Sequence, residues 1–290
     1  MSGYIFSEAE PGERERLDVM ARLWDPETIR SVRELGIGAG SRCLEAGAGT
    51  GSVARALAEL VGPDGRVLAV DRDPRFLTGL PGQVEVRQAD VMAGDLPQRQ
   101  FDLVHARLLV AHLHPRRQAL RRLADAVAPG GWLLVEEVDW TWADLVVPAA
   151  PGHVAMVRAL SHVMGGGAAG SDEVTAGSGG FDATCGRRLL ADVLGLGFRN
   201  ESARYHGTQS RGTGEAWLAW QLLVRQFQDA IVAAGLLSQP DVDAWWSLSR
   251  DGGSLLASVA MFTVQAQRPR DQDRNRVGSA AMPRSTMLGL

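Results

Sequence analysis

The chain has 290 residues, a formal net charge of −4 and 45% hydrophobic residues, which suits a globular protein with one substantial core and a smaller addition. The slightly acidic balance argues against a nucleic-acid partner, because the arginine pairs at 116–117 and 121–122 have the spacing of a solvated helix face. Two cysteines do not make a disulfide framework, no apolar run approaches the roughly 20 residues of a membrane span, and the first residues do not resemble a signal peptide. We therefore expect a cytoplasmic protein with no membrane partner.

Two helices are predicted before the first strand. Residues 8–23 have an amphipathic pattern. Asp25 followed by Pro26 is typical of an N-cap and a first helical position, which predicts a second helix running to about Leu35.

A strand, a glycine turn and a helix follow. Residues 43–46 are an apolar run, and glycines at every second position of 47–51 allow a sharp turn and a close approach of the backbone to a ligand. The predicted helix begins near Thr50, and its unpaired N–H groups favour an anionic group at the turn. The dinucleotide fingerprint would need a glycine where Ser52 stands, and the phosphate loop would need a lysine that is absent. The pattern therefore favours neither of these two phosphate sites.

Four further apolar runs predict strands at residues 66–71, 84–91, 101–107 and 130–137, with a helix over 116–127 before the last of them. Asp71 ends the first of these runs, 24 positions after Gly47, close to the spacing at which an acid reaches a ribose diol. Asp90 stands near the end of the next run. The alternation of strands and helices predicts an α/β fold.

The run Glu45-x-Gly47-x-Gly49-x-Gly51, followed by strands that end in acids, resembles the class I S-adenosylmethionine (SAM) dependent methyltransferases, in particular bacterial enzymes of small-molecule and natural-product metabolism. The resemblance implies an α/β, Rossmann-like seven-stranded sheet whose seventh strand is antiparallel, with helical N-terminal and cap additions. It also implies SAM as the cofactor, S-adenosylhomocysteine as the product and a small-molecule acceptor. The implied cofactor-binding residues are Glu45, Gly47, Gly49, Gly51, Asp71, Arg72, Asp90, Val91 and Ala106, with Asp71 on the ribose and Asp90 facing the adenine amino group.

The chain outside the core is organised as additions. We expect N-terminal helices over 1–39, a SAM-binding core over 40–148, a helix and glycine-rich lid over 149–182, the rest of the sheet over 183–267 with a helical insert at 213–250, and a polar tail over 268–290. The N-terminal helices either cover the active site, which would bring Tyr4, Phe6 and Trp24 near the substrate, or pack on the outside of the sheet. The tryptophans of the insert follow a helical apolar face, for which core packing is favoured over a substrate wall by roughly two to one.

Catalysis in such an enzyme consists largely of holding a nucleophile in line with the S–CH₃ bond, and a base is needed only if that nucleophile loses a proton. The candidates are the polar groups that follow the fourth and fifth strands. We rank Glu137 and His112 first, followed by His105, Arg107 and Tyr4. Because neighbours on a strand face opposite ways, only one of Glu136 and Glu137 should face the site. No metal is expected, since the Asp-Asn pair of metal-dependent catechol-type enzymes is missing.

Eight tryptophans, several of them in the insert, favour an aromatic or heteroaromatic acceptor, for example an indole-containing metabolite. The acceptor atom, whether oxygen, nitrogen or carbon, stays open, and a homodimer is compatible with the sequence. One alternative is a SAM-binding protein that catalyses a cyclisation or regulates without methyl transfer. Another is a nicotinamide oxidoreductase, against which Ser52 argues.

Overall fold

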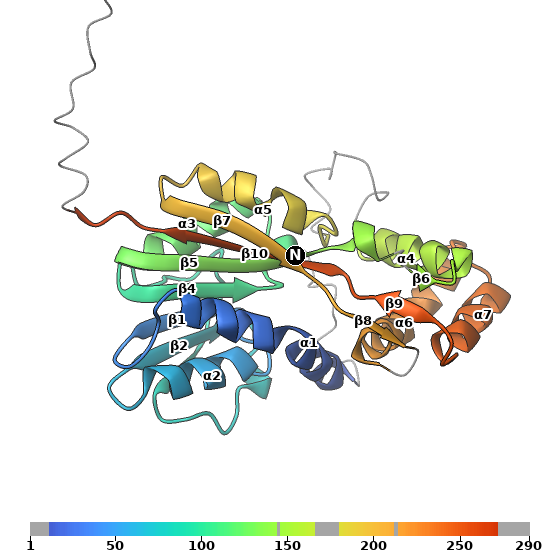
Figure 1. Cartoon of the computed structure of the whole chain (residues 1–290), viewed down its shortest axis with the longest axis horizontal. Helices are drawn as coiled ribbons and strands as arrows, with labels where there is room; N and C mark the ends of the chain where they lie inside the picture. Colours follow the sequence, from blue (N-terminus) through green and yellow to red (C-terminus); the bar gives the residue numbers. More distant parts are fainter. Residues whose placement is uncertain (1–11, 144–145, 166–179, 212–213, 272–290) are drawn as a thin grey trace, which may run out of the picture.

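The computed structural model describes residues 12–143, 146–165, 180–211 and 214–271. Seven strands form the larger sheet: β1 (Arg42–Ala46), β2 (Arg66–Asp71), β3 (Val84–Gln88), β4 (Phe101–Arg107), β5 (Val127–Asp139), β7 (Arg199–His206) and β10 (Ala260–Gln267). They lie in the order β3-β2-β1-β4-β5-β10-β7 (Figure 1). Only β10 is antiparallel to its neighbours, β5 and β7. The predicted seven-stranded sheet with an antiparallel seventh strand is therefore confirmed.

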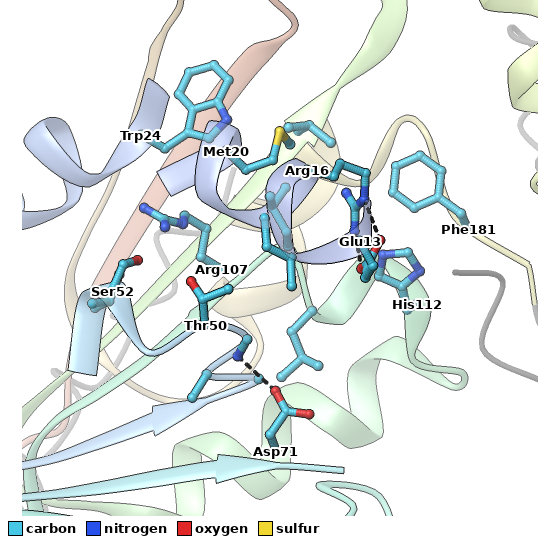
Figure 2. A pocket seen from close by; sticks show the side chains of 18 of the residues that line it. Glu13, Arg16, Met20, Trp24, Thr50, Ser52, Asp71, Arg107, His112 and Phe181 are labelled. Atoms are coloured by element: carbon cyan, nitrogen blue, oxygen red, sulfur yellow. Dashed lines mark hydrogen bonds and ion pairs between the residues drawn. The ribbon is translucent and has the colours of Figure 1, made fainter. Parts of the chain in front are cut away.

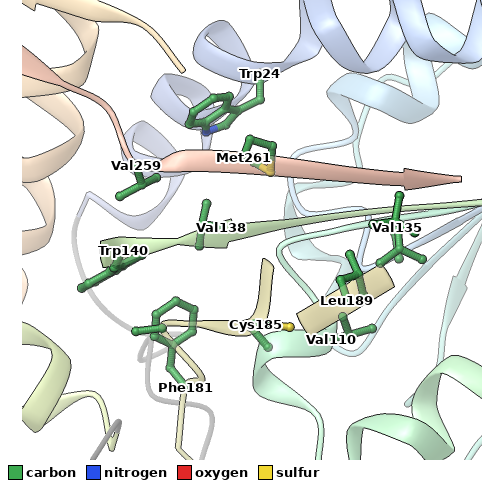
Figure 3. Packing of buried hydrophobic residues seen from close by; sticks show 14 of the residues in the cluster. Trp24, Val110, Val135, Val138, Trp140, Phe181, Cys185, Leu189, Val259 and Met261 are labelled. Carbon is green, nitrogen blue, oxygen red and sulfur yellow. The ribbon is translucent and has the colours of Figure 1, made fainter. Parts of the chain in front are cut away.

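Helices cover both faces of this sheet because side chains alternate along its buried strands. In β1, Cys43 packs with the apolar face of α2 (Ser52–Val61), whereas Leu44 packs with α3 (Arg116–Ala126). The helix α5 (Cys185–Leu194) lies on the same face as α3, and Figure 3 shows its Cys185 and Leu189 near Val110.

The N-terminal segment is one helix, α1 (Glu13–Glu34), and the predicted break at Pro26 is wrong. Asp25 does not cap a second helix; its carboxylate accepts hydrogen bonds from Arg107 and Ser52. A proline inside a helix removes one backbone hydrogen bond and costs about 3 kcal/mol. Burial of one continuous face, which includes Val19, Trp24 and Val32, offsets that cost on both sides of Pro26.

A smaller unit, here called the cap, lies beyond one end of the large sheet (Figure 1). It contains β6 (Val146–Val147), α4 (Pro151–Val163), β8 (Gln209–Arg211), α6 (Glu215–Ala233), α7 (Gln239–Ser249) and β9 (Leu255–Ala257). The insert predicted over 213–250 carries α6 and α7. The three-stranded sheet β6-β9-β8 was not predicted, because strands of two or three residues leave too short a periodic pattern.

Several sequence expectations concern residues outside the described ranges. These are Tyr4 and Phe6, residues 166–179 of the predicted lid, and residues 272–290 of the tail. Among the helices that the structure describes, none combines the length and the apolar character that a membrane span requires.

Candidate functional site

A cavity of about 620 Å³ lies at the carboxyl ends of β1, β2, β4 and β5, where α1 and the cap meet the sheet (Figure 2). Ligands of open α/β sheets bind at this edge, because the strands end there and the chain turns into helices. The wall has a polar part, formed by the strand ends and the glycine turn, and an apolar part, formed by α1, the cap and the chain after β4 and β5.

The glycine turn between β1 and α2 forms the floor of the polar part. Gly49 has a φ of +55°, which favours glycine, and a Cβ built there would meet only Leu17, at 3.9 Å. The backbone is therefore open to the cavity at Gly49. Gly47 also lines the cavity, whereas Gly51 lies behind the wall against Leu77 and Leu80.

Asp71, at the end of β2, faces the same cavity. Its Oδ2 accepts the N–H of Gly49 at 2.8 Å, and its Oδ1 accepts the N–H of Asp73 at 2.9 Å. Burial raises the pKa of this carboxyl, although the two amide hydrogen bonds oppose the shift. Asp71 therefore both holds the glycine turn and lines the cavity beside Arg72.

Asp90 and Val91 complete the polar part from the turn after β3. Asp90 Oδ1 accepts the N–H of Met92 at 2.7 Å, and Arg122 donates to the carbonyl of Val91 at 2.5 Å. These bonds fix the turn from both sides. Ala106, by contrast, is fully buried within β4 and does not line the cavity.

Beneath the wall, His105 of β4 lies between two carboxylates. Its Nδ1 is 2.5 Å from Oε2 of Glu45, and its Nε2 is 3.3 Å from Oε2 of Glu136. His105 is fully buried and does not reach the cavity, whereas Glu45 lines it. Two residues further along β4, Arg107 lines the cavity and donates hydrogen bonds to Asp25 at 2.6 Å and Thr28 at 2.9 Å.

Glu136 and Glu137 are both fully buried, and neither lines the cavity. The reason is that β5 continues to Asp139, two residues beyond the predicted end, so that Val138 and Trp140 reach the wall instead. Glu137 Oε1 accepts the N–H groups of Val110 and Ala111 at 2.6 and 3.2 Å. Burial raises the pKa of Glu137 to about 8. In this position Glu137 holds a short turn of the chain and does not contact the cavity.

That turn, η2 (Val110–His112), carries His112 into the wall. Burial, together with the nearby charges of Arg16, His114 and Arg72, lowers the pKa of His112 to about 3. Its imidazole is therefore neutral near pH 7, which leaves one ring nitrogen able to accept a hydrogen bond. Close to His112, Arg16 and Glu13 of α1 form a buried ion pair at 2.7 Å (Figure 2).

Four rings from separate parts of the chain, His112, Phe181, Trp140 and Trp220, form what we call the aromatic wall. Ring centroids lie 5.0 Å apart for His112 and Phe181, and 5.1 Å apart for both Phe181–Trp140 and Trp140–Trp220. Met20, Leu23 and Trp24 of α1 also line this apolar part. The result is an apolar slot in which His112 is a polar group.

The tryptophans of the insert divide between the two roles considered from the sequence. Trp220 lines the cavity, whereas Trp217 and Trp245 pack around His153 in the core of the cap. Neither Trp140 nor Phe181 was predicted from the sequence as a site residue. Trp140 could have been found from a longer fifth strand, but no local pattern marks Phe181.

Among the described residues, no group of three or more His, Cys, Asp and Glu side chains is arranged to hold a metal ion.

A mixed sheet in this order, with a glycine-floored cavity at its carboxyl edge, defines the class of Rossmann-like proteins to which methyltransferases belong. A family model described as a methyltransferase domain matches residues 44–133. Residues 44–133 therefore match a methyltransferase domain, in agreement with the class that the sequence motifs and the sheet order indicate.

Two curated relatives are methyltransferases by name, and a solved structure has the same fold. Methyltransferase str2 of Strobilurus tenacellus is 35% identical over 145 residues, which are 50% of this chain and 52% of that protein. The ubiquinone/menaquinone biosynthesis C-methyltransferase UbiE of Pseudomonas putida is 34% identical over 127 residues, 41% of this chain and 48% of that protein. The chain thus spans about half the length of these curated relatives. The YcgJ protein of Bacillus subtilis has the same fold, with a TM-score of 0.54 at 14% identity over 84% of this chain and 97% of its own.

Proposed function

We propose that this protein transfers a methyl group from SAM to a small, flat aromatic or heteroaromatic metabolite. The observation that carries the proposal is the division of one cavity into a glycine-floored, acid-lined part and an adjoining aromatic slot. The first part has the polar groups that suit a nucleoside with an amino-acid tail, and the second has the aromatic rings that suit a planar acceptor.

The residues of the polar part fit SAM. The open backbone at Gly49 would lie against the methionine portion, with Gly47 beside it in the cavity wall. Asp71 would accept the ribose hydroxyls, and Asp90 with Val91 would face the adenine. When bound, SAM supplies a methyl group that the sulfonium charge already activates. The chain then has to bind, orient and shield the acceptor.

The aromatic wall orients the acceptor. A flat ring stacked between Trp140 or Phe181 and the α1 side chains would have its face fixed by packing and its edge directed by the neutral imidazole of His112. Fixing the face and edge of the ring in this way keeps the reacting atom turned in one direction. An ion pair between Arg22 and Glu215, at 2.8 Å, connects α1 to α6. Because α1 and the cap are joined in this way, together they help to exclude water from the cavity.

The name of one relative supports a ring-bearing acceptor. UbiE is named for C-methylation in the biosynthesis of ubiquinone and menaquinone. We infer that the acceptor of this protein is likewise a ring compound, in keeping with the natural-product metabolism expected from the sequence.

The test is methyl transfer itself. The purified chain is incubated with methyl-labelled SAM and a set of hydroxylated and unsubstituted indoles, naphthalenes and quinols, and products are identified by mass spectrometry. We expect label in at least one ring compound, and none when Gly49 is replaced by valine. Binding of SAM without label in any acceptor would favour the non-methylating alternative, and no binding of SAM would contradict the cofactor assignment.

A further inference from the structure

Five charged side chains form a buried charge network under the cavity wall: Glu45 on β1, His105 and Arg107 on β4, Glu136 on β5 and Asp25 on α1. Arg107 connects to Glu136 through the hydroxyl of Thr28, which accepts from Arg107 at 2.9 Å and donates to Glu136. The network thus runs from the start of the glycine turn to the helix that covers the acceptor slot. Its members are buried or half-buried, where charges interact strongly.

His105 is the cation at the centre of this network. Each of its ring nitrogens faces a carboxylate oxygen, and only the doubly protonated ring can donate to both. Burial by itself would lower the pKa of His105, but the charges and hydrogen bonds of Glu45 and Glu136 raise it to about 9. The ring is therefore an imidazolium near neutral pH.

Glu136 is the permanent anion of the network. Its carboxylate accepts from His105, from Thr28 and from Thr263 at 2.7 Å. Burial opposes ionisation, yet His105, Arg107 and Thr28 lower the pKa of Glu136 to about 2. Glu136 has no exposed surface and does not reach the cavity, so it can act on a ligand only through its neighbours.

Glu45 is the carboxylate of the network that reaches the cavity wall. Burial raises the pKa of Glu45 even though His105 opposes that shift. With all five groups ionised, the three carboxylates face two cations, and one negative charge is left without a balancing cation within the network. A cation bound on the cavity side of Glu45 would balance this remaining negative charge.

The transferred methyl group has to lie where the two parts of the cavity meet. The nucleoside part is at the ends of β2 and β3, marked by Asp71 and Asp90, and the acceptor slot is at the ends of β4 and β5. The ends of β1 and β4, with Glu45 and Arg107, lie between them in the sheet order. A sulfonium held where the two parts of the cavity meet would therefore lie next to Glu45 and Arg107 of the buried charge network.

We propose that His105 and Glu136 are positioning residues that fix the charge of Glu45 at the cavity wall, so that the site favours the cationic sulfonium cofactor over its neutral thioether product. This inference rests on the proposed SAM dependence. It gives the network a role in releasing S-adenosylhomocysteine after transfer, because loss of the methyl group removes the sulfonium charge, whereas the methionine ammonium is common to both ligands. Neither positioning residue touches the ligand.

The test compares the dissociation constants of SAM and S-adenosylhomocysteine by calorimetry, in the wild type and in Glu136→Gln. Glutamine keeps the shape and most hydrogen bonds but removes the charge. We expect SAM to bind about tenfold more weakly and S-adenosylhomocysteine to change by less than about threefold. Asp192→Asn is the matched control, because Asp192 is also a buried carboxylate bonded to an arginine, Arg116, but lies on α5 away from the cavity. It should change neither constant by more than about twofold.

Equal weakening of both ligands by Glu136→Gln, or no change in either, would overturn the proposal while leaving the proposed function intact. Failure of the wild type to bind either ligand would overturn the proposed function instead. A second measurement needs no variant. In the wild type labelled with ¹⁵N at its six histidines, one buried histidine should keep both ring protons at about pH 8. The ¹⁵N resonances of this ring should shift more when SAM binds than when S-adenosylhomocysteine binds. The absence of a doubly protonated histidine would contradict the network.

Discussion

The backbone N–H of Gly49 donates a 2.8 Å hydrogen bond to Oδ2 of Asp71. This bond joins the two motifs that the sequence suggested for a cofactor, the glycine turn after β1 and the acid at the end of β2. It also means that Asp71 has a structural role in addition to any contact with a ligand.

Asp71→Ala should weaken SAM binding by roughly 2–4 kcal/mol, because it removes the acceptor for the ribose hydroxyls as well as the support of the glycine turn. Calorimetry measures the affinity and thermal unfolding measures the stability. Asp73→Ala is the control, since Asp73 also lines the cavity but its carboxylate caps the short helix η1 (Pro74–Phe76). That change should lower stability by about 1 kcal/mol with little effect on affinity. If Asp71→Ala bound SAM within threefold of the wild type, Asp71 would not be the ribose ligand.

Gly49→Ala should abolish or strongly weaken SAM binding, since its Cβ would project from the cavity floor, with Leu17 at 3.9 Å as its nearest neighbour. Gly40→Ala offers a matched control. Gly40 also has a positive φ, +78°, but a Cβ there meets nothing within 4 Å, and it does not line the cavity. Both changes should cost about 1–2 kcal/mol of stability through backbone strain. Affinity should fall in Gly49→Ala alone, and equal affinity in the two variants would show that the turn is merely structural.

Trp220 and Trp217 lie one helical turn apart on α6 and both contact His153, but of the two only Trp220 lines the cavity. Trp220→Leu should raise the KM for an aromatic acceptor by about tenfold with little change in the KM for SAM, because it removes one ring of the aromatic wall. Trp217→Leu should instead lower the free energy of unfolding by about 2–4 kcal/mol, because Trp217 is fully buried against His153 and Trp245. Steady-state kinetics and denaturant unfolding separate the two effects. An unchanged acceptor KM in Trp220→Leu would remove that ring from the substrate site.

Glu137 should make the fold less stable as the pH rises from about 4.5 to 8. The pKa of its carboxyl is about 8 in the folded chain and 4.5 for an unperturbed glutamate, so over this range the folded chain binds a proton that the unfolded chain has lost. Glu137→Gln keeps an oxygen for the amides of Val110 and Ala111 but cannot ionise. The melting temperature of this variant should therefore fall less between about pH 5.5 and pH 8.5 than that of the wild type, whereas the exposed control Glu59→Gln should behave as the wild type does. Identical pH profiles for Glu137→Gln and the wild type would contradict a protonated Glu137.

The sequence predicted the parts of the fold that depend on local patterns. The runs that became β1, β2 and β4 are largely apolar and of strand length, and glycines followed by acids mark where the chain turns at the sheet edge. The class of protein and the polar part of the cavity could therefore be predicted from residues 43–91.

The remaining differences arise from tertiary packing. Pro26 stays inside α1 because both halves of the helix bury the same face, and two additional residues of β5 put Glu137 behind the wall and Trp140 in it. Phe181 reaches the aromatic wall from a loop with no periodic pattern. The pairing of His105 with Glu45 and Glu136 depends on the register of β1, β4 and β5, which single-strand patterns do not contain.

The proposed function requires that the cavity bind SAM in its polar part. The most direct measurement is calorimetric titration of the wild type with SAM and, separately, with NAD. We predict one SAM site per chain that is lost in Gly49→Val, and no heat of binding with NAD. Binding of NAD in preference to SAM, or SAM binding that survives in Gly49→Val, would contradict the assignment of SAM to this cavity.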